Sequence, residues 1–298
     1  MSNKLTGITF YCNFNHGDNH LVRSLIRYVK DDFDLYDIKL KHPNGEKDLK
    51  DLNISLFWKP PKEKFDFRGY YKEYGILYFN YQVLAYNRKH FAKDSFTIIT
   101  AYNIFNQTLK ENFNSKLPGE IIDYLPSIDY SQYIIENTDL FTNWCDGDKK
   151  KVLICNNTPQ SDQSININFE DIIGHLKVTF PDVLFFITNG SSHIGNNVME
   201  AEMLVGSGSN LNEISYLSTK CDVIIGRYSG PHTFTYVKEN LLNPDKTFIT
   251  FCPSSPLYGK WPELWCDMGV SQLTDKHAKF VNIITDVQNK IDNVIRNI

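Results

Sequence analysis

The sequence has no long run of basic residues and no closely spaced pair of cysteines. Its longest run of lysine or arginine covers only residues 149–151, which argues against nucleic acid as the main partner. The six cysteines include no C-x-x-C pair. Four of them, Cys12, Cys155, Cys221 and Cys252, lie in or beside expected strands. This usage is typical of small core residues and indicates neither a disulfide framework nor a zinc site.

The chain also lacks the apolar segments that direct or anchor proteins at membranes. Residues 1–14 contain no apolar signal core, and no window approaches the length of a membrane span. We therefore expect a cytoplasmic protein without a transmembrane segment, and a peripheral association with a membrane stays open. At 298 residues, with 42% hydrophobic residues and a net charge of −4, the chain is long enough for one large domain or two ordinary ones.

Apolar segments alternate with helical patterns along both halves of the chain, which predicts an α/β fold. The apolar, strand-like segments are 8–14, 33–40, 54–58, 76–79 and 97–100, then 152–155, 183–188, 221–225 and 247–252. The helical patterns are 20–30, 81–91, 103–114, 169–180, 212–219, 233–242 and 278–298. Residues 118–151 contain Pro118 and Pro126 and a polar run, and they are interpreted as a connector.

This alternation predicts two α/β domains, 1–145 and 146–298, with a last helix that can pack back on the first domain. Two such halves favour a cleft between them, and open α/β sheets bind ligands beyond the carboxyl ends of their strands. Three loops follow expected strands and are therefore candidates for a site: 15–19, 156–164 and 226–232.

The segment G-R-Y-S-G-P-H at 226–232 follows the strand 221–225 and opens a helix. Such a turn aims unpaired backbone N–H groups and the positive end of a helix at one point, where a phosphate fits. Arg227 adds a fixed cation with a fork of donors. A tight connection between a strand and a helix has the same pattern, so this alternative stays open.

The loop N-H-G-D-N-H at 15–20 lies between the first strand and the first helix. Gly17 permits a sharp turn, and a carboxylate at Asp18 is able to take a proton from an attacking hydroxyl. His16 and His20 are further titratable candidates near the cleft. The alternative is that Asp18 or Asn19 caps a helix that starts near His20.

The loop 156–164 carries short hydrogen-bonding side chains, among them Asn156, Asn157 and Ser161, which suit phosphate or sugar oxygens. Ordinary polar loops have a similar composition. Asp146 and Asp148 match the D-x-D pattern of metal-binding glycosyltransferases, but D-G is common in surface turns, and we expect no metal site. The segment W-P-E-L-W at 261–265 is interpreted as a packing loop.

Several of these motifs together resemble the GT-B glycosyltransferases, and within them the bacterial lipopolysaccharide heptosyltransferase-like group. The first half has Gly17-Asp18 before a helix that contains Leu25-Ile26-Arg27. The second half has an L-x-E-x-x-x-L helix at 211–217, then a strand and the turn 226–231. The resemblance covers nearly the whole chain in the order of its elements.

The resemblance implies a GT-B-like fold of two Rossmann-like domains that face a central cleft. It also implies that Asp18 is the catalytic base and that Ser229, Gly230, Pro231 and His232 hold the donor diphosphate. The chain departs from the family at Tyr228, where the family has an acidic residue, and at Arg227, where it has an apolar or small one. The lysine common in the first loop of the second domain has no counterpart in 156–164.

The predicted function is metal-independent and cofactor-independent transfer of a sugar from a nucleotide-diphosphate donor to a hydroxyl of a glycan, lipid or protein acceptor. Such a reaction belongs to polysaccharide or lipopolysaccharide biosynthesis, with a nucleotide sugar and a glycan or glycolipid as partners. Three alternatives stay open: a GT-B-like sugar-nucleotide epimerase, a nucleotide-sugar or glycan-binding protein without catalysis, and a pair of α/β domains used for protein interaction.

Overall fold

The chain folds into two compact units, Met1–Ser127 and Ile128–Ile298. The boundary places residues 128–145 in the second unit, whereas the sequence assigned them to the first. The structure is a computed structural model, and at some positions of its helices and strands only the backbone is described. The residues that it describes are 7–11, 16–32, 37–41, 49–53, 55–56, 70–73, 76–80, 98–133, 138–158, 167–206, 211–227, 230–251, 269–283 and 287–298.

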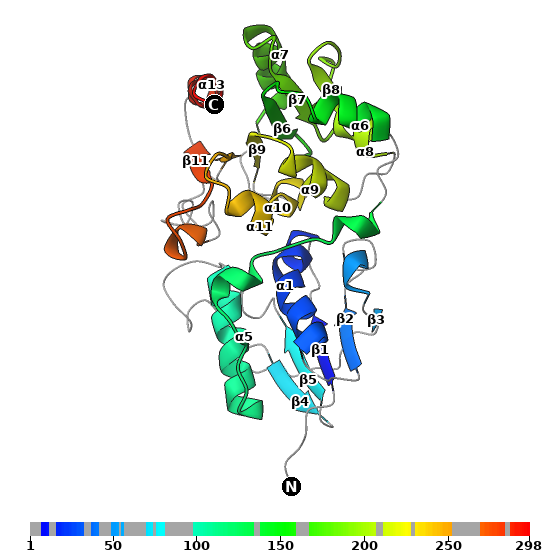
Figure 1. The fold of residues 1–298 in the computed structure, drawn as a ribbon, viewed down its shortest axis with the longest axis vertical. Helices are drawn as coiled ribbons and strands as arrows, with labels where there is room; N and C mark the ends of the chain where they lie inside the picture. The colour runs from blue at the N-terminus through cyan, green and yellow to red at the C-terminus, as the bar shows by residue number, and fades with distance from the viewer. Residues whose placement is uncertain are drawn as a thin grey trace. The chain divides into compact units, whose positions relative to one another are not determined.

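Unit 1 is a five-stranded sheet with the order β3-β2-β1-β5-β4, accompanied by α1 and α5 (Figure 1). The strands β1, β2, β3 and β5 run parallel, and β4 pairs antiparallel with β5. Its elements are β1 (Gly7–Tyr11), α1 (His16–Asp32), β2 (Asp37–Lys41), η1 (Lys50–Leu52), β3 (Ser55–Leu56), β4 (Tyr70–Glu73), β5 (Ile76–Asn80), α5 (Ile98–Phe113) and η2 (Ile121–Tyr124).

The amphipathic pattern of α1 is confirmed, because Leu21, Leu25, Ile26 and Val29 are all buried. These residues recur at helical spacing and cover one face of the helix. The neighbouring Arg27 donates to Asp51 Oδ2 and to Ser127 Oγ, both at 2.5 Å. The segment Leu25-Ile26-Arg27 therefore has a structural role in this chain. Leu25 and Ile26 pack in the core, and Arg27 links α1 to Asp51 and Ser127 by hydrogen bonds.

Unit 2 is a six-stranded parallel sheet with the order β11-β10-β9-β6-β7-β8. This is the doubly wound arrangement of a Rossmann domain, in which the chain starts at a central strand and extends first to one side and then to the other. Its elements are η3 (Tyr130–Gln132), α6 (Thr138–Cys145), β6 (Lys151–Cys155), α7 (Phe169–Thr179), β7 (Leu184–Ile187), β8 (Val198–Glu200), α8 (Ala201–Val205), α9 (Leu211–Thr219), β9 (Val223–Arg227), α10 (Gly230–Phe234), α11 (Lys238–Leu241), β10 (Thr247–Phe251), η5 (Val270–Gln272), β11 (Lys279–Ile283) and α13 (Val287–Arg296).

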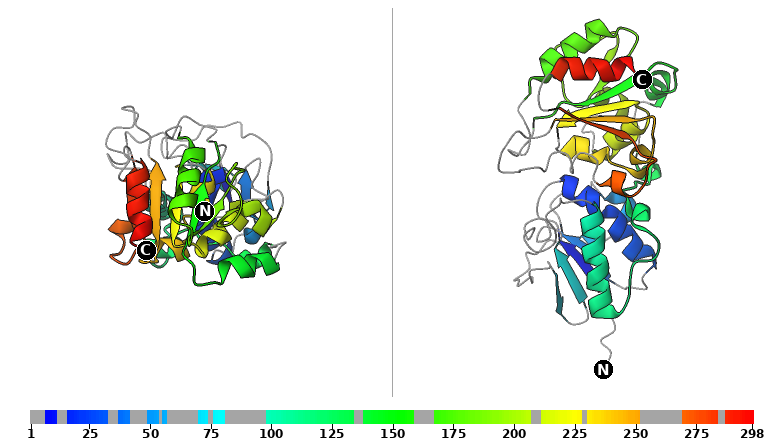
Figure 2. Two further views of the ribbon diagram at one scale, coloured as in Figure 1. Left: turned by 90° about the horizontal axis from the view of Figure 1, so that it is seen from above. Right: turned by 90° about the vertical axis from the view of Figure 1, so that its left-hand side faces the viewer.

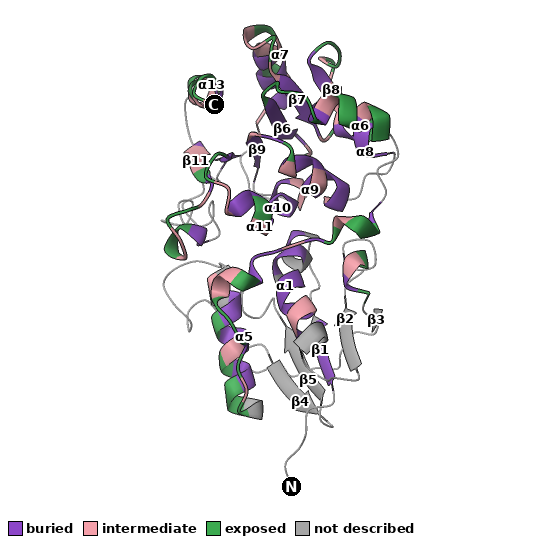
Figure 3. Ribbon diagram, viewed as in Figure 1, coloured by how far each residue is buried: buried purple, intermediate pink, exposed green. Residues whose placement is uncertain are grey.

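Helices cover both faces of this sheet, so its central strands β6 and β9 are buried along their whole length (Figure 3). On one face, alternate strand residues form a core with α7 and α13, which lie side by side in Figure 2. Ile291 and Ile295 of α13 belong to that core, and His175 Nε2 of α7 lies 3.0 Å from Asp292 Oδ1. The last helix therefore packs on unit 2. The other face of the sheet contacts α6, where Trp144 packs on Phe186, and α10.

Several sequence-based boundaries are wrong, and in two of them pairing in the folded sheet overrides local propensity. The expected helix 278–298 begins as a strand, because residues 279–283 complete the ladder of β10. The expected strand 221–225 extends through Gly226 and Arg227, which pair with β6 and β10. The expected helix 233–242 is two short helices, because Asn240 Nδ2 donates to Thr235 O at 2.8 Å and stabilises the break.

Other elements were missed, or begin earlier than the sequence predicts. The connector contains the helix α6, and β4, β8 and α8 were not predicted. The apolar segment 97–100 is in its described part the first turn of α5. The strand 8–14 is confirmed as far as Tyr11, and the helix expected at 20–30 begins at His16. The expected helix 81–91 and the segment 261–265 lie outside the described residues. Among the residues that the structure describes, no helix has the length and apolarity to cross a membrane.

We predict that Gly226→Ala destabilises unit 2. A Cβ at this position would lie 2.7 Å from His232 Cδ2 and 2.9 Å from Cys155 Cβ, so two packed elements must shift. Overpacking of this kind costs about 1–3 kcal/mol in the free energy of unfolding. The control is Gly147→Ala, where nothing lies within 4 Å of the added carbon. Equal urea midpoints for both variants would contradict the close packing at Gly226.

Candidate functional site

The sheet of unit 2 has a topological switch point between β6 and β9. From β6 the chain proceeds to β7 and β8 on one side, and it returns to β9 on the other. The helices that follow these two neighbouring strands, α7 and α10, pack on opposite faces of the sheet. In α/β proteins, ligand-binding crevices form at such switch points. The described residues at this edge include Asn156 and Asn157 after β6, Arg227 at the end of β9, and Gly230 at the start of α10.

Asn156 links the ends of β6 and β7 through its side-chain amide. Its Nδ2 donates to Asn189 O at 2.7 Å, and its Oδ1 accepts from Asn189 N at 2.8 Å. Its own backbone N–H donates to Thr188 Oγ1 at 3.1 Å. The side chain is therefore engaged in a paired hydrogen bond that holds the two strand ends in register, and a role toward a ligand stays a prediction.

Thr188 and Asn189 were missed by the sequence analysis. The Thr188 hydroxyl donates to Asn157 Oδ1 and therefore fixes the side chain of Asn157. The signal in the sequence was their position. Thr188 is the last residue of the expected strand 183–188, and Asn189 directly follows it. In a parallel sheet the carboxyl ends of neighbouring strands lie at one edge, and residues there come together.

Arg227 is buried, with 3% of its surface exposed. Its Nη1 donates to Asn157 O at 3.0 Å, and its Nη2 donates to Ile167 O. Its Cζ lies 4.8 Å from the centre of the Phe169 ring, in a cation–π arrangement. Burial lowers the pKa of the guanidinium from its usual value. The donor fork that the sequence predicted beside the turn is thus directed at backbone carbonyls.

The alternation of strand β9 separates two of the predicted donor-binding residues. Side chains of a strand point alternately to opposite faces, so Arg227 shares the α7 face with Val223 and Ile225. Gly226 lies on the other face, where the ring of His232 packs against its backbone. The structure therefore brings Arg227 to Asn157 and His232 to Gly226, on opposite faces of the sheet.

His232 is fully buried, and neither ring nitrogen has a hydrogen-bond partner among the described residues. Its ring meets Tyr236 edge-on at 5.2 Å between centroids and Phe248 at 6.1 Å. Burial lowers the pKa of this histidine from 6.5 to about 3, so the ring is neutral at physiological pH. In this position His232 acts as an aromatic packing group.

The helix that begins after the turn is only one turn long, since α10 covers five residues, Gly230–Phe234. The partial charge at a helix end arises from aligned peptide dipoles, so a five-residue helix attracts an anion weakly. Gly230 and Pro231 lie in this helix and are half-buried. The predicted site residues Ser161 and Ser229, and Tyr228 beside them, lie outside the described residues.

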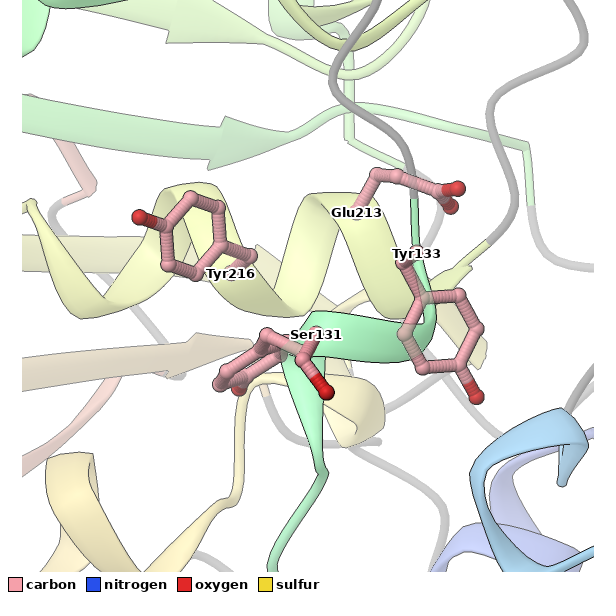
Figure 4. A pocket seen from close by; sticks show the side chains of 5 residues that line it. Ser131, Tyr133, Glu213 and Tyr216 are labelled. Atoms are coloured by element: carbon pink, nitrogen blue, oxygen red, sulfur yellow. The ribbon is translucent and has the colours of Figure 1, made fainter.

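A cavity of about 270 Å³ lies in unit 2 between η3 and α9 (Figure 4). It is lined by Tyr130, Ser131, Tyr133, Glu213 and Tyr216. The Tyr130 hydroxyl is 3.0 Å from Ser215 Oγ, so this ring is fixed against α9. Helix α9 begins next to the start of α10, because a Cβ at Gly230 would lie 4.0 Å from Leu211 Cδ1. The cavity combines aromatic faces with one carboxylate, a combination that suits a ring bearing hydroxyl groups.

In unit 1 the predicted catalytic loop is part of a helix. His16, Gly17 and Asp18 are the first three residues of α1, which follows β1 at the switch point between β1 and β5. The prediction that Asp18 or Asn19 caps a helix starting near His20 is therefore wrong. Asp18 lies in the first turn, where the helix dipole stabilises a negative charge. Gly17 and His20 are buried, and His20 has no exposed surface.

The D-x-D segment lies on the surface of unit 2. Asp146, Gly147 and Asp148 follow α6 and are exposed, and Gly147 O accepts a hydrogen bond from Lys151 Nζ at 2.5 Å. Within the described ranges of the chain, no group of three or more histidine, cysteine, aspartate or glutamate residues has an arrangement suited to a metal ion.

No protein-family model matches the chain, and no curated protein matches it in sequence. Solved structures are similar in fold. A glycosyl transferase family 9 structure from Veillonella parvula aligns over 100% of this chain and 92% of that chain, with 12% identity and a TM-score of 0.54. The E. coli heptosyltransferase WaaC with ADP-2-deoxy-2-fluoro heptose aligns over 98% and 99%, with 13% identity and a TM-score of 0.49. The S. aureus MnaA–UDP structure aligns over 98% and 87%, with 10% identity and a TM-score of 0.49.

The predicted fold class is confirmed. Both units are α/β, unit 2 has the Rossmann strand order, and the chain as a whole has the fold of the family 9 glycosyl transferase structure. The resemblance to heptosyltransferase-like GT-B proteins therefore holds at the level of the fold. The roles of the two domains and the cleft between them stay predictions.

We predict that replacing His232 by leucine reduces the acid sensitivity of folding. The unfolded state binds a proton near pH 6.5 and the folded state only near pH 3, so stability falls as the pH drops through this interval. Between pH 7 and pH 5 this single group accounts for a loss of about 2 kcal/mol. Urea unfolding of both proteins at a series of pH values measures the difference. Parallel stability curves for wild type and His232→Leu would contradict the prediction, because they would show that folding leaves the pKa of His232 unchanged.

Proposed function

We propose that this chain is a glycosyltransferase that moves a sugar from a nucleotide-diphosphate donor to a hydroxyl of a glycan, lipid or protein acceptor without a metal ion. The observation that carries the proposal is the likeness of fold along 100% of the chain to a family 9 glycosyl transferase structure. A fold hosts many functions, so the proposal also depends on the chemistry of the two switch points and the cavity.

Unit 2 is the donor-binding domain in this proposal. The switch point between β6 and β9 is the position where Rossmann domains bind nucleotides, and its edge is lined by amides and hydroxyls. The cavity beside α9 offers tyrosine rings for stacking and the Glu213 carboxylate as an acceptor for ribose or sugar hydroxyls. On this proposal the nucleotide sugar lies along the crevice, with one of its rings in the cavity.

Unit 1 supplies the base in the proposed reaction. Asp18 accepts the proton of the acceptor hydroxyl, and the hydroxyl oxygen forms a bond to the anomeric carbon of the donor. The bond between that carbon and the diphosphate oxygen breaks, and its electron pair leaves with the diphosphate. The backbone N–H groups near Gly230 stabilise this leaving charge. The support for Asp18 is its position in the first turn of α1, after the central strand β1.

The proposal is tested by incubating the protein with nucleotide-diphosphate sugars, first alone and then with glycan and glycolipid acceptors, in the presence of EDTA. Sugar transfer that requires an acceptor and survives EDTA supports it. A change in the donor sugar without any acceptor identifies an epimerase instead. Binding without turnover identifies a nucleotide-sugar-binding protein. Activity that is lost in EDTA and restored by magnesium or manganese contradicts metal independence.

We predict that Glu213→Gln weakens donor binding. A hydroxyl bound to a carboxylate contributes roughly 1.5–3 kcal/mol, so the loss corresponds to about tenfold or more in affinity. Thermal-shift titration measures it, because a donor at 100 times its dissociation constant stabilises the protein by about 2.7 kcal/mol. The control is Glu239→Gln, which changes an exposed carboxylate on α11. Equal donor affinities for the two variants would remove Glu213 and the cavity from the donor site.

We predict that Asp18→Asn loses turnover while it keeps its fold and its donor affinity. Removal of a general base typically lowers the rate by about 100- to 10,000-fold. Loss of one charge in the first turn of a helix costs at most about 1 kcal/mol of stability. Asp32→Asn changes a carboxylate at the other end of the same helix and is the matched control. Turnover of Asp18→Asn close to that of the control would rule out the catalytic role.

A further inference from the structure

Arg227 is a cation inside a folded domain, and the described contacts of its guanidinium are to the main chain and to an aromatic ring. One nitrogen donates to Asn157 O at 3.0 Å and another to Ile167 O. Burial of a charge is costly unless the charged group is hydrogen-bonded. Arg227 is 3% exposed, and its guanidinium donates hydrogen bonds to two carbonyls. These bonds offset the cost of burying the charge, and they fix the positions of the two carbonyls.

The two carbonyls belong to different parts of unit 2. Asn157 follows β6, and Ile167 precedes α7, so the residues between them form the connection from the strand to the helix. One planar guanidinium thus fixes both ends of this connection against the end of β9. A lysine has a single nitrogen at the end of a flexible stem, and it does not match two carbonyls with a rigid fork.

Aromatic packing holds the guanidinium in place. The Phe169 ring lies 4.8 Å from Cζ, and it meets Phe251 edge-on at 5.6 Å. Phe251 is the neighbour of Arg227 in the pairing of β9 with β10. The arginine, the first residue of α7 and the end of β10 therefore form one packed group, which we call the Arg227 tie.

We infer that Arg227 is a positioning residue for the donor site, which acts by fixing the backbone at Asn157 and Ile167 and not by its own contact with the diphosphate. This inference rests on the proposed function. The alternation of β9 supports it, because Arg227 lies on the α7 face while α10 lies on the other. Arg227 holds the carbonyls of Asn157 and Ile167. Asn157 follows β6 at the switch point, so the position of its backbone affects how a ligand binds at the end of this strand.

The first test needs no ligand. Hydrogen exchange of the free protein is compared for wild type, Arg227→Lys and Arg227→Gln, with Arg296→Ala as the control. Arg296 is exposed and lies 5.5 Å from the Phe180 ring, so it matches the cation–π contact without the carbonyl bonds. We expect amides at 153–158 and 167–171 to exchange roughly tenfold faster or more in both Arg227 variants, the factor that corresponds to one charge-assisted bond. Exchange equal to wild type at these amides would overturn the inference.

The second test compares donor affinity in the same variants at several salt concentrations. A positioning role predicts that Lys and Gln lose affinity alike, by about tenfold or more, with the salt dependence of the wild type, because a charge alone does not restore the tie. A direct phosphate contact predicts that lysine retains most of the affinity and that glutamine loses it together with part of the salt dependence. This second result would overturn the inference.

Phe169→Leu provides a variant that leaves the arginine unchanged. It keeps an apolar residue at the start of α7 but removes the ring beneath the guanidinium, so we expect the same faster exchange and a smaller loss of donor affinity. Unchanged affinity together with faster exchange would show that the tie is structural only, which also overturns the inference. If the wild type binds no nucleotide diphosphate, the proposed function fails, and the donor role of Arg227 fails with it. The exchange experiment then still reports separately on the tie itself.

Discussion

The pairing of β6 with β9 at the centre of the six-stranded sheet is the constraint on which unit 2 depends. Both strands are buried on both faces, so every residue along them is assigned to one of two packed layers. A shift of one residue would exchange the layers, since side chains alternate along a strand. The close contact of Gly226 with Cys155 follows from this register, and the alternation along β9 places Arg227 on the opposite face.

At the carboxyl end of these strands the chain changes from an apolar core to a polar edge. Asn156, Thr188 and Asn189 exchange hydrogen bonds with each other, and Arg227 binds carbonyls. These contacts give hydrogen-bond partners to backbone and side-chain polar groups at the ends of the strands. In the proposed function these groups border the donor site, so folding and donor binding use one set of residues.

The two faces of β9 carry residues with different roles. On one face, Gly226 leaves room for the His232 ring, and burial keeps that ring neutral. On the other, Arg227 binds the connection that leads to α7. A turn that seemed from its composition to gather a cation, a histidine and backbone donors at one point is instead divided by the sheet.

The cavity beside α9 is a second feature of unit 2, and this helix begins next to the start of α10. Two of its tyrosines, Tyr130 and Tyr133, lie in the segment 118–151, which we interpreted from the sequence as a connector. Cavities of this kind form from segments that are far apart in the chain, so periodicity within one segment gives no signal for them.

The sequence by itself determined the α/β class, the buried strands β6, β7, β9 and β10 and the apolar face of α1, because hydrophobic periodicity is a local property of the chain. It also predicted that the loops after β6 and β9 carry the donor-site residues, and this stays a prediction. Only the tertiary structure decided that 279–283 is a strand, because these residues pair with the edge of β10. It also decided that α1 includes Asp18. It also decided the direction of Arg227 and the burial of His232, because both depend on which layer covers each face of the sheet. That layer is built from residues distant in sequence, and no local pattern encodes it.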